Sequence, residues 1–182
     1  RNGAAVRHPY SFSSSFMKRI LNQAGLKTTK LFLTEWNVSP LADRRHDTHY
    51  GASYLIRGLI DLTDSETEAQ TLYVLSSEVP DDTGYIGSLG QFKSGRTLSP
   101  KAGFNALKLF SMLGNDASRV SARVLDDDIY AIATYDGTNL SLLLTYYTMN
   151  EDPDYSLSEQ VSIDIKNMPF SSYGYKVYRI DK

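Results

Sequence analysis

A single glutamate ends a short apolar segment near the start of the chain. Glu35 directly follows the segment Leu31–Thr34, which contains no charged residue. Strands that are apolar throughout are typical of parallel sheets buried on both faces. The carboxyl ends of such strands face the crevice or barrel mouth in which α/β folds bind ligands. Glu35 is therefore a candidate catalytic carboxylate, and the alternative is an acid that ends the strand and caps the following turn.

A second group of polar residues, His46, Asp47 and His49, has side chains of the types that bind metal ions. Their spacing matches no metal-binding motif. Asp47 and Thr48 are also residue types that cap helices, and they stand directly before an apolar helical pattern. The sequence therefore predicts helix initiation here rather than a metal site. No cofactor is expected, and the absence of cysteine excludes disulfides and thiolate chemistry.

The elements that would position Glu35 alternate between helix and strand. Apolar residues recur at helical spacing in residues 13–24, in residues 49–62, and between Ser99-Pro100 and Gly114. Between these segments, Leu31–Asn37 and Leu72–Leu75 have the length and composition of strands. The order helix-strand-helix-strand-helix predicts an α/β unit with a parallel sheet.

Beyond Gly114 apolar residues alternate with polar residues, which is the pattern of half-buried antiparallel strands. Strands are predicted at residues 120–124, 129–135, 140–147, 161–165 and 173–180. Asp136 and Gly137 separate two of these strands and predict a hairpin, because both residues tolerate positive φ. The change of period predicts two domains, an α/β domain over residues 1–116 and an antiparallel β domain over residues 117–182.

The composition excludes several classes of partner. The 182 residues include 19 basic and 21 acidic side chains, which give a formal net charge of −2, and no Lys/Arg cluster is interleaved with aromatic residues. A nucleic-acid partner is therefore not expected. No apolar run reaches the roughly 20 residues that a membrane-spanning helix needs, so no membrane partner is expected either. The sequence leaves the cellular compartment open.

Two motifs in the first half resemble those of a known family. Thr34–Ser39 reads TEWNVS, and Asp47–Tyr54 reads DTHYGASY. They resemble the patterns T-E-[YFW]-N-x-S and D-T-x-Y-x-A-x-Y of glycoside hydrolase family 39, which contains β-xylosidases and α-L-iduronidases. The resemblance implies the last strands and helices of a (β/α)8 barrel, followed by a β-sandwich. A complete barrel takes about 250 residues, so the resemblance implies only the carboxyl-terminal portion of such an enzyme.

By this resemblance, Glu35 corresponds to the catalytic nucleophile of a retaining glycosidase. Such an enzyme needs a second carboxyl group about 5 to 5.5 Å away to protonate the leaving oxygen. In the family, that acid/base glutamate belongs to an Asn-Glu motif on an earlier barrel strand, which the resemblance places before residue 1. Asn150-Glu151 is the only such pair here, and it stands in a turn-rich connection of the predicted β domain. It is therefore not assigned the acid/base role.

The resemblance also implies the residues that contact the sugar. Trp36 and Asn37 adjoin the nucleophile, and Trp36 either stacks on a sugar ring or fills the core at the barrel rim. Asp81 or Asp82 corresponds to the family's acidic sugar contact, and the alternative is a solvated acidic loop. Val74 stands where the family has tryptophan. This difference leaves the substrate open between β-xylosides and related glycosides.

The sequence thus predicts part of a retaining glycoside hydrolase that is inactive alone, because its acid/base residue is missing. The partner of the longer enzyme would be a carbohydrate substrate. The alternative is a noncatalytic carbohydrate-binding or scaffold module. A barrel remnant of two strands exposes a strand edge and apolar side chains. We therefore expect either that the helices repack over this edge or that the chain forms a homo-oligomer through it.

Overall fold

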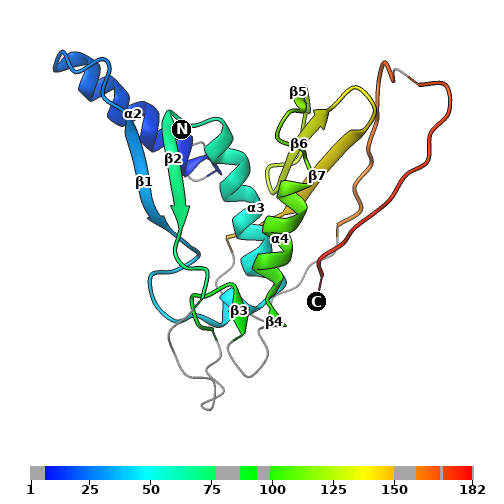
Figure 1. Ribbon diagram of the computed structural model, residues 1–182, viewed down its shortest axis with the longest axis horizontal. Helices are drawn as coiled ribbons and strands as arrows, with labels where there is room; N and C mark the ends of the chain where they lie inside the picture. Colours follow the sequence, from blue (N-terminus) through cyan, green and yellow to red (C-terminus); the bar gives the residue numbers. More distant parts are fainter. Residues whose placement is uncertain (1–6, 77–86, 94–98, 150–158, 169, 182) are drawn as a thin grey trace.

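The computed structural model describes residues 7–76, 87–93, 99–149, 159–168 and 170–181 (Figure 1). The helices are α2 (Pro9–Gln23), α3 (His49–Thr63), α4 (Ala102–Ser111) and the short 3₁₀ helix η1 (Arg44–Asp47). The strands are β1 (Leu31–Trp36), β2 (Thr67–Leu72), β3 (Phe92–Lys93), β4 (Ser99–Pro100), β5 (Ser118–Val120), β6 (Ile129–Tyr135) and β7 (Leu140–Tyr146). The fold therefore mixes helices with a small parallel sheet and with antiparallel sheets.

Strands β1 and β2 form a two-stranded parallel sheet, in which Leu31 pairs with Thr67 and Trp36 with Leu72. The parallel arrangement agrees with the sequence-based prediction. The predicted position of the second strand, Leu72–Leu75, is wrong, because β2 ends at Leu72. Most side chains of β2 are polar, so the strand lacks the apolar signal on which the prediction depended, and its pairing with β1 determines its position.

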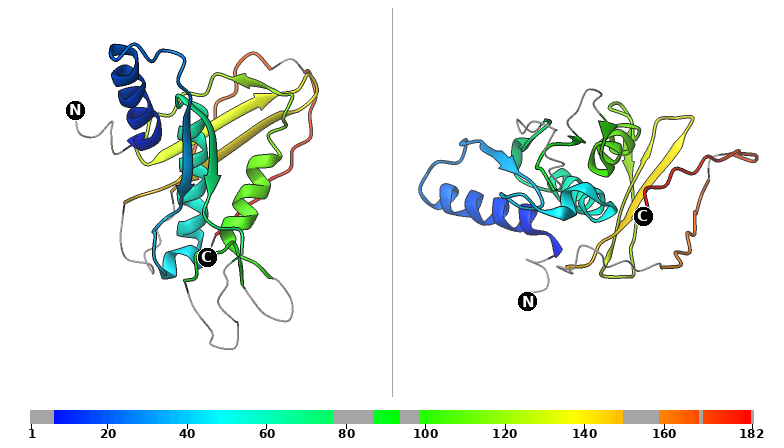
Figure 2. Two further views of the ribbon diagram at one scale, coloured as in Figure 1. Left: turned by 60° about the vertical axis from the view of Figure 1, so that its left-hand side comes forward. Right: turned by 90° about the horizontal axis from the view of Figure 1, so that it is seen from below.

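Among the described residues, helices α2 and α3 lie on one face of this sheet (Figure 2). Trp36 packs against Leu55 and Leu59 of α3, and its ring lies 5.6 Å from that of Tyr10 in α2. Phe32, by contrast, is 60% exposed. The prediction that β1 is buried on both faces is therefore wrong, because no element among the described residues covers the second face.

Helix α3 lies between the parallel pair and the antiparallel sheet (Figure 1). It begins after Thr48, whose Oγ1 accepts a hydrogen bond of 3.3 Å from the backbone N–H of Tyr50, which confirms the predicted helix start. A core cluster joins α3 to α4, β6 and β7. Its buried members are Tyr50, Ala52, Ile56, Ile60, Ala106, Leu113, Tyr130, Ile132 and Tyr147. The cluster draws on both predicted domains, and their division at residue 116 stays a prediction.

Helix α2 begins at Pro9, four residues before its predicted start, and its N-cap His8 makes no side-chain capping bond. The fully buried Asp61 of α3 takes that role. Its carboxylate accepts hydrogen bonds from the backbone N–H groups of Tyr10 at 2.7 Å and Ser11 at 3.3 Å. A carboxylate is favourable there because the first N–H groups of a helix lack partners within it. Asp61 thereby fixes the start of α2 on α3.

Strands β5, β6 and β7 form an antiparallel sheet in that order. The predicted hairpin between β6 and β7 is confirmed, since Gly137 has φ +96° and Asp136 Oδ1 accepts from the backbone N–H groups of Thr138 and Asn139. Strand β5 ends at Val120, where the predicted strand of residues 120–124 begins. That predicted strand is therefore displaced toward the carboxyl end.

The start of α4 also differs from the prediction. Ser99 and Pro100 form β4, which pairs antiparallel with β3, and the helix begins at Ala102. Backbone pairing across the loop overrides the local helix-start signal of Ser-Pro. Gly114 follows the helix with φ +84°, a conformation that glycine adopts readily, in agreement with the predicted helix end.

The last two predicted strands, residues 161–165 and 173–180, are not strands of the structure. They run beside the sheet without pairing, and large apolar side chains such as Ile163 and Val177 are exposed (Figure 1). Phe170, whose ring lies 6.1 Å from that of Tyr135, and Ile180, which packs on the core cluster, anchor this segment. The predicted β-sandwich needs two packed sheets, and the described residues beyond Gly114 form one. No helix in the described ranges has both the length and the apolar character to cross a membrane.

Candidate functional site

Glu35 is the second-to-last residue of β1 and is exposed. Successive side chains of a strand point to opposite faces. Leu33 and Trp36 both pack on the cluster with α3, although strict alternation would place them on opposite faces. The register of β1 on β2 shifts between Leu33 and Trp36, so the strand is irregular around the carboxylate. Glu35 thus lies at the carboxyl end of a parallel strand, and its role as nucleophile stays a prediction.

Trp36 is 6% exposed and belongs to the core. Its indole N–H donates to the side-chain carbonyl of Gln70 on β2. Its ring also lies 6.4 Å from that of Tyr54 on α3. These contacts correspond to the core role considered for Trp36, so we assign no sugar contact to its buried ring.

Asn37 ties the end of β1 to the loop that follows β2. Its side-chain amide donates to the backbone carbonyl of Tyr73 and, at 3.2 Å, to that of Leu89. Its own side-chain carbonyl accepts from the backbone N–H of Val38 at 2.7 Å. Because both amide protons have protein acceptors, the predicted sugar contact of Asn37 would need a rearrangement of these bonds.

The loop after β1 is ordered by a short-range ion pair. Asp43 accepts from the backbone N–H of Arg45 at 2.9 Å and forms a salt bridge with its guanidinium. The side-chain hydrogen bond from Arg45 holds the pKa of Asp43 below its ordinary value. Arg45 also lies over the ring of Tyr50, 5.6 Å from its centroid. Arg45 is thus engaged within the loop, whereas Arg44 is exposed.

The loops after β1 and β2 meet at Gly87. Its carbonyl accepts from the backbone N–H of Asp43 at 2.8 Å and lies 3.0 Å from Nδ1 of the buried His46. Its N–H donates to Asp47 at 2.5 Å. These three bonds bring the second loop against η1, at the same end of the sheet as Glu35.

A buried lysine, which no sequence pattern predicted, completes this contact. Lys101 is 3% exposed, and its ammonium lies 2.6 Å from Asp47 Oδ1. Lys101 directly follows a Ser-Pro pair that resembles a helix start, and its partner is distant in the sequence. Neither feature marks it as a buried residue of the candidate site.

Two of the three residues considered for a metal site have other partners. His46 bonds with Gly87 and Asp47 with Lys101, while His49 is the first residue of α3. Nowhere in the described part of the chain do three His, Cys, Asp or Glu side chains converge as metal ligands would.

The remaining predicted site residues lie outside the described residues. Asp81 and Asp82, which correspond to the family's acidic sugar contact, are among them. So is Asn150-Glu151, the pair to which no role was assigned.

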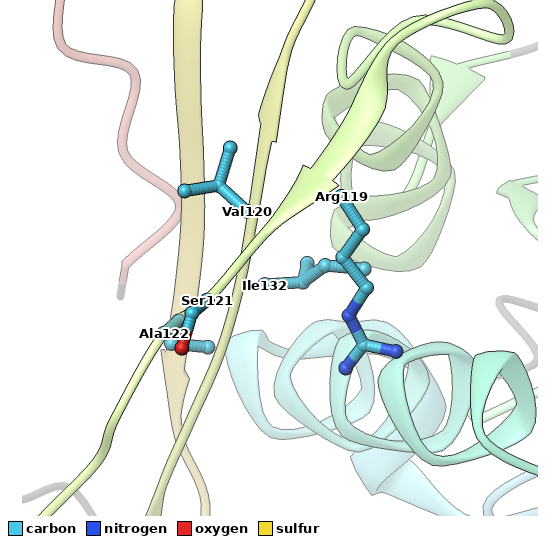
Figure 3. A pocket seen from close by; sticks show the side chains of 6 residues that line it. Arg119, Val120, Ser121, Ala122 and Ile132 are labelled. Atoms are coloured by element: carbon cyan, nitrogen blue, oxygen red, sulfur yellow. The ribbon is translucent and has the colours of Figure 1, made fainter.

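A shallow hollow of about 400 Å³ lies on the antiparallel sheet (Figure 3). It is lined by Arg119, Val120, Ser121, Ala122, Ala131 and Ile132. Arg119, its one charged side chain, forms a bidentate ion pair with Asp64 at the end of α3. The hollow therefore offers neither a free charge nor an acid/base pair, and Glu35 stays the candidate for chemistry.

Comparisons with known proteins bear on the fold. No family model matches the sequence, and no curated protein matches it. Among solved structures, a GH39 beta-xylosidase from Caulobacter crescentus is similar, with a TM-score of 0.52 and 17% sequence identity. The match covers 71% of this chain and 28% of that protein, so the chain spans less than a third of its length. The likeness shows a fold shared with part of a GH39 beta-xylosidase.

Proposed function

We propose that this chain is the carboxyl-terminal part of a retaining glycoside hydrolase that acts on β-xylosides or related glycosides, with Glu35 as its nucleophile. The observation that carries the proposal is the position of Glu35, exposed at the carboxyl end of a parallel strand. The fold likeness to part of a GH39 beta-xylosidase supports it.

In the proposed mechanism, hydrolysis takes place as two successive substitutions at the anomeric carbon. A carboxylate oxygen of Glu35 attacks the anomeric carbon, the bond from that carbon to the leaving oxygen breaks, and a glycosyl ester forms. Water then attacks the same carbon and releases the carboxylate. In the first step a second carboxyl group protonates the leaving oxygen, and in the second step it removes a proton from water. We propose that this group comes from a part of the barrel outside this chain, which leaves the chain inactive alone.

The proposal can be tested with a substrate that needs no acid catalyst. Dinitrophenolate leaves without a proton, and a 2-fluoro substituent slows hydrolysis of the ester. We expect dinitrophenyl 2-deoxy-2-fluoro-β-xyloside to add one fluoroxylosyl group to Glu35, detected by peptide mass spectrometry. Ordinary aryl β-xylosides, which need protonation, are expected to be left intact.

The matched control is Glu68→Gln, which removes another exposed glutamate from the same sheet. Glu35→Gln should abolish the adduct, and Glu68→Gln should leave it unchanged. An adduct that persists in Glu35→Gln, or its absence from Glu35 in the unaltered chain, would contradict the assignment of the nucleophile.

One observation favours a noncatalytic carbohydrate-binding module as the second candidate. Tyr173, Tyr175 and Tyr178 are exposed on the carboxyl-terminal segment, with Tyr175 at 84%, and aromatic faces stack on the apolar faces of sugars. This candidate predicts that xylo-oligosaccharide binding is lost in Tyr175→Ala and retained in Glu35→Gln. The hydrolase proposal predicts instead that Tyr175→Ala still forms the Glu35 adduct and that Glu35→Gln does not.

A further inference from the structure

The ammonium group of Lys101 lies in the interior, in contact with three oxygen atoms. It is 2.6 Å from Asp47 Oδ1, 2.7 Å from the backbone carbonyl of Ser88 and 2.9 Å from the Ser88 hydroxyl. Two of its three N–H donors therefore have acceptors on Ser88, and the contact with Asp47 is an ion pair. We call Asp47, Gly87, Ser88 and Lys101 the Lys101 cluster.

Asp47 makes the cluster a connection between three segments. One carboxylate oxygen contacts Lys101, at the N-cap of α4, and the other accepts from the backbone N–H of Gly87. Asp47 itself ends η1, in the loop after β1. The cluster therefore joins that loop, the loop after β2 and the start of α4.

Gly87 brings the two loops into backbone contact. It has φ +84°, and a Cβ atom added there would lie 2.5 Å from the carbonyl carbon of Asp43. Asn37 adds a further bond, since its amide donates to the carbonyl of Leu89 in the same loop. The loop after β2 is thus attached both to η1 and to the end of β1, two residues beyond Glu35.

Local preferences do not explain this arrangement. A cation at a helix N-terminus is unfavourable, because the helix dipole is positive there, and Lys101 makes no capping bond to α4. Burial of an unpaired charge is also costly. The ion pair with Asp47 and the bonds to Ser88 offset both costs only while the two loops are in contact. The stability of the cluster is therefore coupled to the closed arrangement of the loops.

We propose that Asp47 and Lys101 are positioning residues, which hold the loops after β1 and β2 together and so shape the rim of the site at Glu35. Loops at the carboxyl ends of parallel strands border the ligand in α/β folds. The effect on the site at Glu35 rests on the proposed function, whereas the contact between the two loops does not.

The first test is hydrogen exchange in Lys101→Met, followed at the amides of Gly87 and Asp43. Both amides donate across the contact between the loops, to Asp47 and to Gly87. We expect their exchange to accelerate at least tenfold, while the amides of β6 and β7 keep their protection. Exchange within twofold of the unaltered chain at both amides would overturn the proposal.

The matched control is Lys30→Met. Lys30 forms an ion pair of similar length, 2.7 Å to Glu68, but it is exposed and lies at the other end of the strands. The same substitution should leave the Gly87 and Asp43 amides unchanged, and equal acceleration in both variants would overturn the proposal. If amides throughout the chain exchange faster in Lys101→Met, the test is repeated with Ser88→Ala. There, acceleration confined to the two amides supports the proposal and unchanged exchange overturns it.

The second test connects the cluster to the site. With the fluorinated xyloside, Lys101→Met should raise the half-saturating donor concentration for the Glu35 adduct at least fivefold, with the maximal rate within twofold. Loss of protein stability alone would not produce this separation. If the unaltered chain forms no adduct, the proposed function fails, and the exchange experiment still decides whether the cluster closes the loops.

Discussion

At the residue scale, Gly87 combines a positive φ with a close approach of neighbouring backbone atoms. Its φ of +84° disfavours any side chain, and a Cβ atom would lie 2.5 Å from the Asp43 carbonyl carbon. A left-handed conformation costs a non-glycine residue roughly 1–2 kcal/mol. With the added steric conflict, we expect Gly87→Ala to lower the free energy of unfolding by about 2 kcal/mol or more, measured by urea denaturation.

Gly137 provides a control for this prediction. It also has a positive φ, +96°, but nothing lies within 4 Å of its added Cβ. Gly137→Ala should therefore show only the conformational cost, about 1 kcal/mol. Equal losses of unfolding free energy in the two variants would show that the close approach to Asp43 does not contribute to the destabilisation of Gly87→Ala.

Single residues differ in how far the sequence predicts them. The position of Glu35 at the end of a parallel strand follows from a local pattern, namely a short apolar run followed by an acid. Thr48 as the cap of α3 is equally local. Lys101 and Asp47 could not be paired in this way, because a buried ion pair depends on which loops meet, and composition near either residue does not show that.

At the scale of elements, the hairpin and α3 followed from the sequence, since their signals lie within the segment itself. Strand β2 did not, because six largely polar residues form a strand only through pairing with β1. The carboxyl-terminal segments show the opposite failure. Apolar and polar side chains alternate in residues 161–165 as they would in a strand. This alternation does not determine which strand the segment would pair with, and in the structure its apolar side chains are exposed.

A pair of tyrosines connects α3 to the end of β7, and we expect it to make the free energy of unfolding decrease at alkaline pH. The hydroxyl groups of Tyr50 and Tyr147 are 3.0 Å apart. Burial, followed by this hydrogen bond, raises the pKa of Tyr147 above its ordinary value of 10.0. Below pH 10 folded and unfolded chains both keep the proton. As the pH rises further, the unfolded chain releases it first, so the free energy of unfolding decreases.

We therefore expect Tyr147→Phe to reduce the loss of stability between about pH 8 and about pH 11 by up to about 1 kcal/mol. Urea denaturation at the two pH values measures this difference. Part of the loss should remain, because burial also raises the pKa of Tyr10. Tyr178→Phe, which changes an exposed tyrosine, should leave the loss unaltered. Equal pH dependence in Tyr147→Phe and the unaltered chain would show that Tyr147 does not contribute to the loss of stability at alkaline pH.

At the scale of the whole molecule, α3 is the helix against which both the β1–β2 pair and the sheet of β5, β6 and β7 pack. Leu55 and Leu59 pack toward β1, and Ile56 and Ile60 belong to the cluster with β6 and β7. One helix therefore serves two cores (Figure 1). The antiparallel sheet gains a covered face in this way, whereas the parallel pair keeps one face and the outer edge of β1 without a partner among the described residues.

This uncovered edge leads us to expect that the isolated chain associates with a second copy. Of the two arrangements considered from the sequence, repacked helices are not seen, since α2 and α3 leave Phe32 exposed. Antiparallel pairing of two β1 strands would join the unpaired N–H and C=O groups of the two edges. A two-fold axis would repeat each of these contacts.

Light scattering at increasing concentration should then give a mass above that of one chain. Phe32→Asp, which puts a charge into the centre of the paired edge, should restore the monomer. Leu125→Asp is the matched control, because Leu125 is also exposed but lies between β5 and β6. It should associate as the unaltered chain does. A monomer at every concentration, or equal loss of association in both variants, would show that the edge of β1 is not the contact. Association through β1 would also cover the strand that contains Glu35, so Phe32→Asp should make that carboxylate more accessible to the fluorinated xyloside.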